Sequence, residues 1–258
     1  FCITLNSLRI KIESATLTRL PPNVRQLDGL TSLIVSQCGL EELPAELGSL
    51  SRLRVLEAVG NKLTALPAEL AKCEALEVLA LGNNALTDVA LIESLESLVT
   101  LNLDRNQLLR LPLPEAQHLK SISAADNQIA ELSPVVGKLQ MLRELTLTNN
   151  KLEELPVQLS ELTPKVLQVV ALQGNPIKDP RIRRFIEDAR PSLVKDLVAH
   201  LQKQASENAK KGGGGGKKKG KGKQKEKAPV ESEPEDDDDG DLSALLAQIN
   251  GAGSGDED

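Results

Sequence analysis

The sequence predicts an α/β solenoid: a curved parallel sheet on the concave face, irregular or helical segments on the convex face, a helical cap at the C-terminal end and a disordered tail. Three observations point to this class. Leucine recurs at one fixed spacing over most of the 258 residues. Apolar residues make up 40% of the chain but aromatic residues only 1%, which favours a core of stacked aliphatic side chains. Runs of glycine, lysine and acids fill the end of the chain, and such segments lack the apolar surface that folding requires.

The repeating unit is L-x-x-L-x-L-x-x-N-x-L, and its copies stay in phase along the chain. Complete copies start at Leu76, Leu98 and Leu142, and slightly altered copies fill the intervals between them. Several copies continue as L-P-x-x-L. The ninth place recurs every 21 to 25 residues, at Ala15, Cys38, Asn61, Asn84, Asn106, Asn127, Asn150 and Asn175. Eight copies over residues 7–178 resemble the leucine-rich repeat family, in the form common among its intracellular members.

Each repeat is expected to form one rung of the solenoid. The alternation in L-x-x-L-x-L predicts a short strand whose leucines point inward and whose other side chains point outward. An Asn at the ninth place can bond to backbone groups where the chain leaves the strand, and Cys38 is expected to replace it there as a weak donor. Cys73 is expected to be ordinary packing in the convex half. A single repeat cannot bury its aliphatic face alone, so the repeats must stack and the ends need caps.

The C-terminal cap is predicted from helix signals that follow the last repeat. Asp179 is a candidate N-cap with Pro180 at the first helical position, and Pro191 starts a second helix. Apolar residues at helical spacing predict a lid from 180 to about 205. Its basic residues form either a solvated face or a contact for an acidic partner: Arg181, Arg183, Arg184 and Arg190. The expected organisation is a solenoid over residues 1–178, a cap over 179–208 and a disordered tail over 209–258.

Residue types that carry catalysis or metal binding are sparse and scattered. The three cysteines form no C-x-x-C pair, and the two histidines, His118 and His200, have no nucleophile or ligand at an informative spacing. The glycines at 212–216 follow no strand and precede no Gly-Lys-Ser/Thr, so they do not form a phosphate loop. The sequence therefore predicts a protein that is not an enzyme, with no cofactor and no metal.

The outward strand positions are the first candidate functional surface. They are polar and of mixed charge, and they contain no Trp or Tyr anchor. An arc of eight strands is long enough for a protein interface of ordinary size. These side chains either bind a protein partner or only keep the sheet soluble. The candidate partner-binding residues are Arg54, Glu57, Glu77, Asn102, Asp104, Arg105, Asp126, Arg143, Glu144 and Thr146.

The tail is the second candidate surface. Its lysines are interleaved with Gly and Gln, which suits salt-dependent attraction to phosphate without base stacking. The eight acids from Glu231 to Asp241 would instead neutralise this tract within the chain. A short amphipathic segment follows at 241–250. The candidate RNA-binding residues are Lys217, Lys218, Lys219, Lys221, Lys223, Lys225 and Lys227.

A narrower resemblance rests on three features taken together. They are the runs Ala-Ala-Asp-Asn at 124–127 and Glu-Leu-Ser-Pro at 131–134, the basic and Leu-rich helices after Asn175, and the Gly/Lys linker that passes into acids. These are similar to the leucine-rich repeat-containing protein 47 family, in which a domain similar to the RNA-associated B3/B4 domain of the phenylalanyl-tRNA synthetase beta subunit follows the linker. The resemblance implies a cytoplasmic role linked to translation.

The functional expectation combines these surfaces. We expect a non-enzymatic, monomeric, cytoplasmic scaffold that binds a protein through its concave face, with weak RNA or ribosome contact through the Lys tail and no membrane association. Two alternatives stay open. The tail is the functional part on an inert spacer, or the chain belongs to an RNA-associated protein whose functional B3/B4-like domain lies beyond residue 258.

Overall fold

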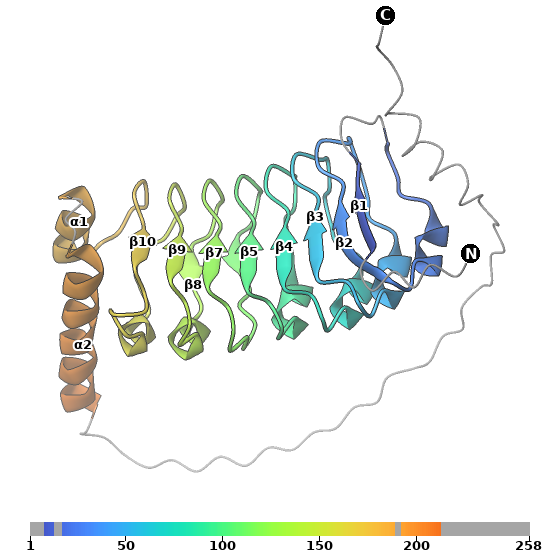
Figure 1. Cartoon of the computed structure of the whole chain (residues 1–258). Helices are drawn as coiled ribbons and strands as arrows, with labels where there is room; N and C mark the ends of the chain where they lie inside the picture. The colour runs from blue at the N-terminus through green and yellow to red at the C-terminus, as the bar shows by residue number, and fades with distance from the viewer. Residues whose placement is uncertain (1–7, 13–16, 189–191, 213–258) are drawn as a thin grey trace, which may run out of the picture.

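The computed structural model describes residues 8–12, 17–188 and 192–212, and it confirms the predicted α/β solenoid (Figure 1). Successive repeats each add one strand to a parallel sheet whose order follows the chain. The central residue of each strand pairs with the central residue of the next, as Leu56 does with Leu79. The eight strands of this sheet, counted over the described residues, are β1 (Leu8–Lys11), β2 (Leu30–Ile34), β3 (Val55–Glu57), β4 (Val78–Ala80), β5 (Thr100–Asn102), β7 (Ser121–Ser123), β9 (Glu144–Thr146) and β10 (Val169–Ala171).

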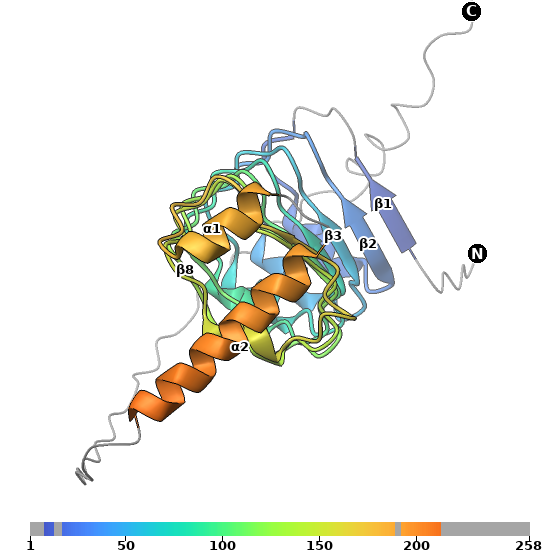
Figure 2. The ribbon, with the colours of Figure 1, turned by 90° about the vertical axis from the view of Figure 1, so that its left-hand side faces the viewer.

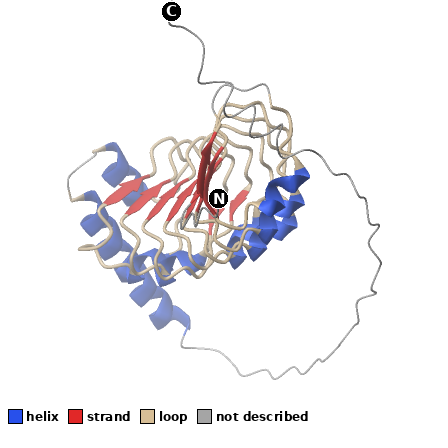
Figure 3. Ribbon diagram, turned by 45° about the vertical axis from the view of Figure 1, so that its right-hand side comes forward, coloured by secondary structure: helices blue, strands red, loops and turns tan. Residues whose placement is uncertain are grey.

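Short 3₁₀ helices form the other side of most coils (Figure 3). Proline is the N-cap of η2, η3 and η6, where its fixed φ suits the residue that precedes a helix. The L-P-x-x-L half of the repeat therefore encodes η2, η3 and η6, whereas η4 has Val89 and η5 has Ser133 as the N-cap. The convex helices are η1 (Pro22–Gln26), η2 (Ala45–Ser49), η3 (Ala68–Lys72), η4 (Ala90–Ser94), η5 (Pro134–Lys138) and η6 (Val157–Glu161).

One coil between η4 and η5 has no convex helix. Its segment contains Pro112 and Pro114, both buried, and a second proline two residues after the first removes another backbone donor that a helix would use. A two-stranded parallel ladder lies beside this coil instead, formed by β6 (Arg110–Leu111) and β8 (Glu131–Leu132). The Leu-Pro pair at Leu111 and Pro112 is therefore not followed by a 3₁₀ helix, unlike the Leu-Pro pairs before η2, η3 and η6.

The interior of the coils is a single continuous aliphatic cluster. Leucines from the fourth and sixth places of neighbouring repeats are fully buried, including Leu79 and Leu81. Glycine brings two convex helices close together: a Cβ built on Gly48 would lie 2.3 Å from the backbone oxygen of Glu69. The same approach recurs at Gly137, which faces the backbone oxygen of Gln158. Stacking of repeats, rather than any one repeat, therefore makes the core.

The ninth-place Asn residues form the expected ladder between repeats. Asn127 Oδ1 accepts from the backbone N–H of Leu108 at 3.1 Å, and its Nδ2 donates to the carbonyls of Leu103 and Ala124 at 3.0 and 3.2 Å. One amide side chain thus satisfies backbone groups of its own repeat and of the preceding one. Cys38 acts in the same place as a weak donor, since its Sγ lies 3.4 Å from the carbonyl of Ile12.

Two helices cover the last repeat, α1 (Pro180–Glu187) and α2 (Leu193–Gly212). Asp179 is the N-cap of α1 and accepts from the backbone N–H groups of Arg181 and Ile182 at 2.8 and 3.2 Å. Helix α2 packs against η6 and β10, and it extends past the edge of the coils (Figure 2). It ends at Gly212 rather than near residue 205. The buried residues of the cap are Ile182, Val194, Leu197, Val198 and Leu201. The Lys tract, the acidic run and the 241–250 segment lie outside the described residues.

Candidate functional site on the concave face

The concave face is the outward side of the eight-stranded sheet, and its predicted residues fall into three tiers. The foot tier lies one residue before a strand, the middle tier lies on the strands, and the upper tier lies where the chain leaves them. Arg54, Glu77 and Arg143 belong to the foot. Glu57, Asn102, Glu144 and Thr146 belong to the middle, and Asp104, Arg105 and Asp126 to the upper tier.

The foot tier contains one ion pair and borders a shallow groove. Arg54 Nη1 lies 3.1 Å from Glu77 Oε1, and both side chains are exposed to solvent. Such surface pairs contribute at most about 1 kcal/mol of stability, so this pair is better suited to contact than to folding. Arg143 has no ion pair within the part of the chain that the structure describes. The groove along this edge is lined by residues that include Glu77, Val99, His118, Lys120 and Met141.

The middle tier divides into two zones along the stack. On β5, β7 and β9 the outward side chains are polar. Ser121 Oγ donates to Glu144 Oε2 of the next strand at 3.1 Å, and Asn102 Oδ1 accepts from the backbone N–H of Asp104 at 3.0 Å. On β2, β3 and β4 the outward side chains are aliphatic except for Ser32 and Glu57. On β10 they are aliphatic again, at Val169 and Ala171. The polar face of mixed charge that the sequence predicts is therefore interrupted by apolar outward positions on these strands.

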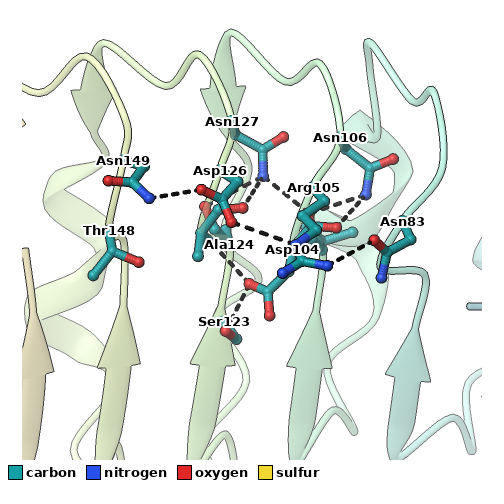
Figure 4. Close-up of polar contacts among 12 residues, drawn as sticks. Asn83, Asp104, Arg105, Asn106, Ser123, Ala124, Asp126, Asn127, Thr148 and Asn149 are labelled. Atoms are coloured by element: carbon teal, nitrogen blue, oxygen red, sulfur yellow. Dashed lines mark hydrogen bonds and ion pairs between the residues drawn. The ribbon is translucent and has the colours of Figure 1, made fainter. Parts of the chain in front are cut away.

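The upper tier forms a continuous row across four repeats (Figure 4). Arg105 lies between two neighbours, with Nη1 3.4 Å from Asn83 Oδ1 and Nε 3.6 Å from Asp126 Oδ2. Asn149 Nδ2 donates to Asp126 Oδ1 at 2.7 Å. Polar groups of this row bond to one another along the rim of the concave face.

Asp104 bonds to the next repeat beside this row. Its Oδ1 accepts from Ser123 Oγ and from the backbone N–H of Ala125, both at 2.7 Å (Figure 4). Charge-assisted bonds of this length are strong. Asp104 therefore joins two successive repeats, a structural role that its outward position did not predict.

Sequence reasoning missed the backbone conformation of the eighth place in the repeat. In the described residues, this position has a positive φ in every repeat from the second to the last, for example 53° at Arg105 and 54° at Asp126. Most side chains avoid this region, whereas Gly, Asn and Asp tolerate it. The signal was present in the sequence as a column in which all residues but Arg105 are Gly, Asn, Asp or Gln: Gln37, Gly60, Asn83, Arg105, Asp126, Asn149 and Gly174.

A second polar cluster, also missed, joins the two cap helices. His200 Nε2 lies 2.8 Å from Asp179 Oδ2, and Gln204 Nε2 donates to the same oxygen at 2.6 Å. Partial burial acts to raise the pKa of Asp179, but the bonds from His200 and from the backbone N–H groups of Arg181 and Ile182 outweigh it and lower the pKa overall. The cluster fixes α2 to the start of α1, and no nucleophilic side chain accompanies it among the described residues.

The remaining candidates for chemistry are occupied by packing. Cys73 is buried, its Sγ lies 3.2 Å from the carbonyl of Leu47, and burial raises its pKa to about 11, so the thiol stays protonated. Within residues 8–12, 17–188 and 192–212, no group of three or more His, Cys, Asp or Glu side chains is placed to hold a metal ion. None of the helices described is both long and apolar enough to cross a lipid bilayer.

Comparison with known proteins identifies the repeat. Residues 51–108 match the family model described as leucine rich repeat. Over 177 residues, 65% of this chain, the sequence is 30% identical to leucine-rich repeat serine/threonine-protein kinase 1 of Mus musculus. The chain spans only 8% of that kinase.

Solved structures show the same fold. The plant peptide hormone receptor RGFR1 in complex with RGF2 is similar at a TM-score of 0.55 and 28% identity, over 61% of this chain and 26% of the receptor. The internalin inlF of Listeria monocytogenes is similar at 0.53 and 28% identity, over 63% of this chain and 47% of the internalin. The fold is therefore a leucine-rich repeat solenoid.

Proposed function

We propose that this leucine-rich repeat solenoid is a scaffold that binds a protein partner through its concave face, and that it is not an enzyme. The observation that carries the proposal is the middle tier. Its side chains project from parallel strands in register, and several of them, such as Glu57 and Thr146, take no part in the bonds that hold the coils together in the described residues.

Two further observations support a role in binding. The core uses only inward side chains, so outward strand positions without such bonds, such as Glu57 and Thr146, can vary without loss of the fold. RGFR1, which has a similar fold, is in complex with RGF2, and we extend the theme of binding to this chain. The free charges of Glu57 and Arg143 give the face a means of selecting one partner over another.

Site-specific photo-crosslinking tests the proposal. A photoreactive amino acid at Thr146 on the concave face should crosslink a discrete protein in extracts of the source cells. The same amino acid at exposed Glu93 on convex helix η4 is the matched control and should crosslink nothing above background. Crosslinks from the convex position alone would reject the concave face as the site.

We also propose that the lysines from Lys217 to Lys227 give the chain weak, salt-dependent contact with RNA or ribosomes in the cytoplasm. The density of positive charge in this tract supports the idea. It fits the resemblance to the leucine-rich repeat-containing protein 47 family, including the alternative in which a B3/B4-like domain follows residue 258. Deleting residues 210–227 should abolish binding to a single-stranded RNA at low salt. Binding that survives the deletion would refute this role, and sedimentation of the purified chain tests whether it is a monomer.

A further inference from the structure

Glu57 is a single carboxylate surrounded by aliphatic side chains on the concave face. On the sheet it pairs with Ile34 of β2 on one side and Ala80 of β4 on the other. Along its own strand the neighbours on the same face are Val55 and Val59, because alternate residues share a face. All four are half-buried, as is Glu57 itself. The patch that these residues form is called the Glu57 patch below.

The carboxylate has no hydrogen bond or ion pair within the described part of the chain. Other acids of the concave face differ: Glu77 pairs with Arg54, Asp126 with Arg105, and Glu144 accepts from Ser121. The apolar neighbours of Glu57 offer its carboxylate no donor, so a donor for it has to come from outside the described part of the chain.

The surroundings determine what would satisfy this charge. A cation that approaches Glu57 must also cover the aliphatic side chains around it, so apolar atoms must lie beside the cation in the same partner. Arg and Lys combine both properties, since their aliphatic stems pack on apolar surface while the charged end reaches a carboxylate. Water is excluded as the patch is covered, which strengthens the ion pair.

We infer that the Glu57 patch binds a polypeptide segment in which one Lys or Arg is flanked by aliphatic residues, the cation pairing with Glu57. This inference rests on the proposed role of the concave face and names the chemistry of its partner. The polar zone on β5, β7 and β9 then contacts the rest of the partner and contributes less to its selection.

Parallel selections of displayed random peptides test the inference. The purified full chain and its Glu57→Gln and Glu57→Lys variants serve as the three targets. Peptides selected on the native chain should be enriched in Lys or Arg between aliphatic residues. Their affinity should fall about tenfold or more on Glu57→Gln, as expected when one member of a covered charge pair is neutralised. The Glu57→Lys target should instead enrich peptides with Asp or Glu between aliphatic residues.

Glu93→Gln is the matched control, because it neutralises an exposed carboxylate on convex helix η4 and should leave the affinity of these peptides unchanged. Equal binding of the selected peptides to the native chain and Glu57→Gln would overturn the inference, as would the absence of basic peptides among the binders. If affinity is lost on Arg143→Glu but not on Glu57→Gln, the inference fails while the concave face stands. If the selected peptides crosslink only to a photoreactive amino acid at position Glu93 on the convex side, both this inference and the proposed function of the concave face fail.

Discussion

Asn127 stabilises a corner of the solenoid that backbone bonds alone leave incomplete. Its side chain is buried and bonds to one backbone N–H and to carbonyls of two repeats. Where the chain turns out of a strand, these groups can pair with neither a helix nor the sheet. The side chain therefore replaces backbone hydrogen bonds. Its contribution to stability is the cost of the backbone groups that would be left unpaired if it were removed.

Replacing Asn127 by alanine should reduce the free energy of unfolding by about 3 kcal/mol, since each buried group left unpaired costs roughly 1–3 kcal/mol. For a chain of this size the midpoint temperature should fall by about 6–12 °C. Thermal unfolding followed by circular dichroism measures the change. Asn127→Cys should lose less stability than Asn127→Ala, because Cys38 occupies the equivalent place in its repeat and donates from its thiol there.

The matched control is Asn208→Ala on an exposed position of α2. It removes the same side chain where no buried backbone group depends on it, so stability should stay within about 0.5 kcal/mol of the native chain. Equal unfolding temperatures for the two variants would show that the ladder does not stabilise the corners.

Much at the scale of single residues could be predicted from the sequence, and some signals were present but unused. The phase of the repeat located the ladder and the inward leucines because both depend only on local spacing. Pairs such as Arg54 with Glu77, or Ser121 with Glu144, lie one repeat apart, so the same phase contained them. The bond from Asp104 to the backbone of Ala125 depends on side-chain rotamers, which spacing does not determine.

Between elements, the link from Asp179 to α2 is the contact that makes two helices into one cap. The carboxylate caps α1 and also binds His200 and Gln204 from the middle of α2. Sequence analysis predicted both helices and the N-cap. It did not predict this link, because the separation of 21 positions between Asp179 and His200 leaves the placement of α2 undetermined without the tertiary structure.

Acid should loosen the cap through Asp179. Its pKa in the folded chain is lowered from the ordinary value of 3.8, so its contribution to stability is present above that value and is lost as the pH falls through the folded pKa. Asp179→Asn should therefore be less stable than the native chain at pH 7, and the difference should shrink once the pH falls below about 4. Denaturant midpoints measured across this range follow the change.

Glu74→Gln, at an exposed position before β4, is the control for the loss of one carboxylate. It should leave the pH dependence of the native chain unchanged. A constant difference between the native chain and Asp179→Asn at all pH values would contradict the assigned role of the charge.

At the scale of the whole molecule, stability depends on covering the open end of the stack. Leucines of the last repeat, such as Leu162 and Leu172, are buried against neighbours and the cap. The aliphatic residues of α1 and α2 close that surface, and each one buried contributes roughly 1.5–3 kcal/mol. Repeat arrays without such caps expose apolar faces and associate.

A chain that stops after Lys178 should therefore bind a hydrophobic dye more strongly and sediment as larger species than a chain that stops after Gly212. The two chains differ only in the cap helices and the short connection between them. Fluorescence and sedimentation velocity test this difference. If both chains sediment as monomers and neither binds the dye, the last repeat needs no cap to cover its apolar surface.

The positive-φ column and the proline-rich coil together govern how such a chain can change in length over generations. In the described residues, each strand of the eight-stranded sheet from β2 to β10 is left through the same left-handed corner, so each of these coils departs in the same direction as the one before it. Between Asn106 and Asn127 the interval shortens to 21 residues, and the loss falls on the back of the coil, where Pro112 and Pro114 replace a helix. Insertions and deletions of a few residues are thus tolerated behind the sheet, whereas the corner itself admits only the gain or loss of an entire coil.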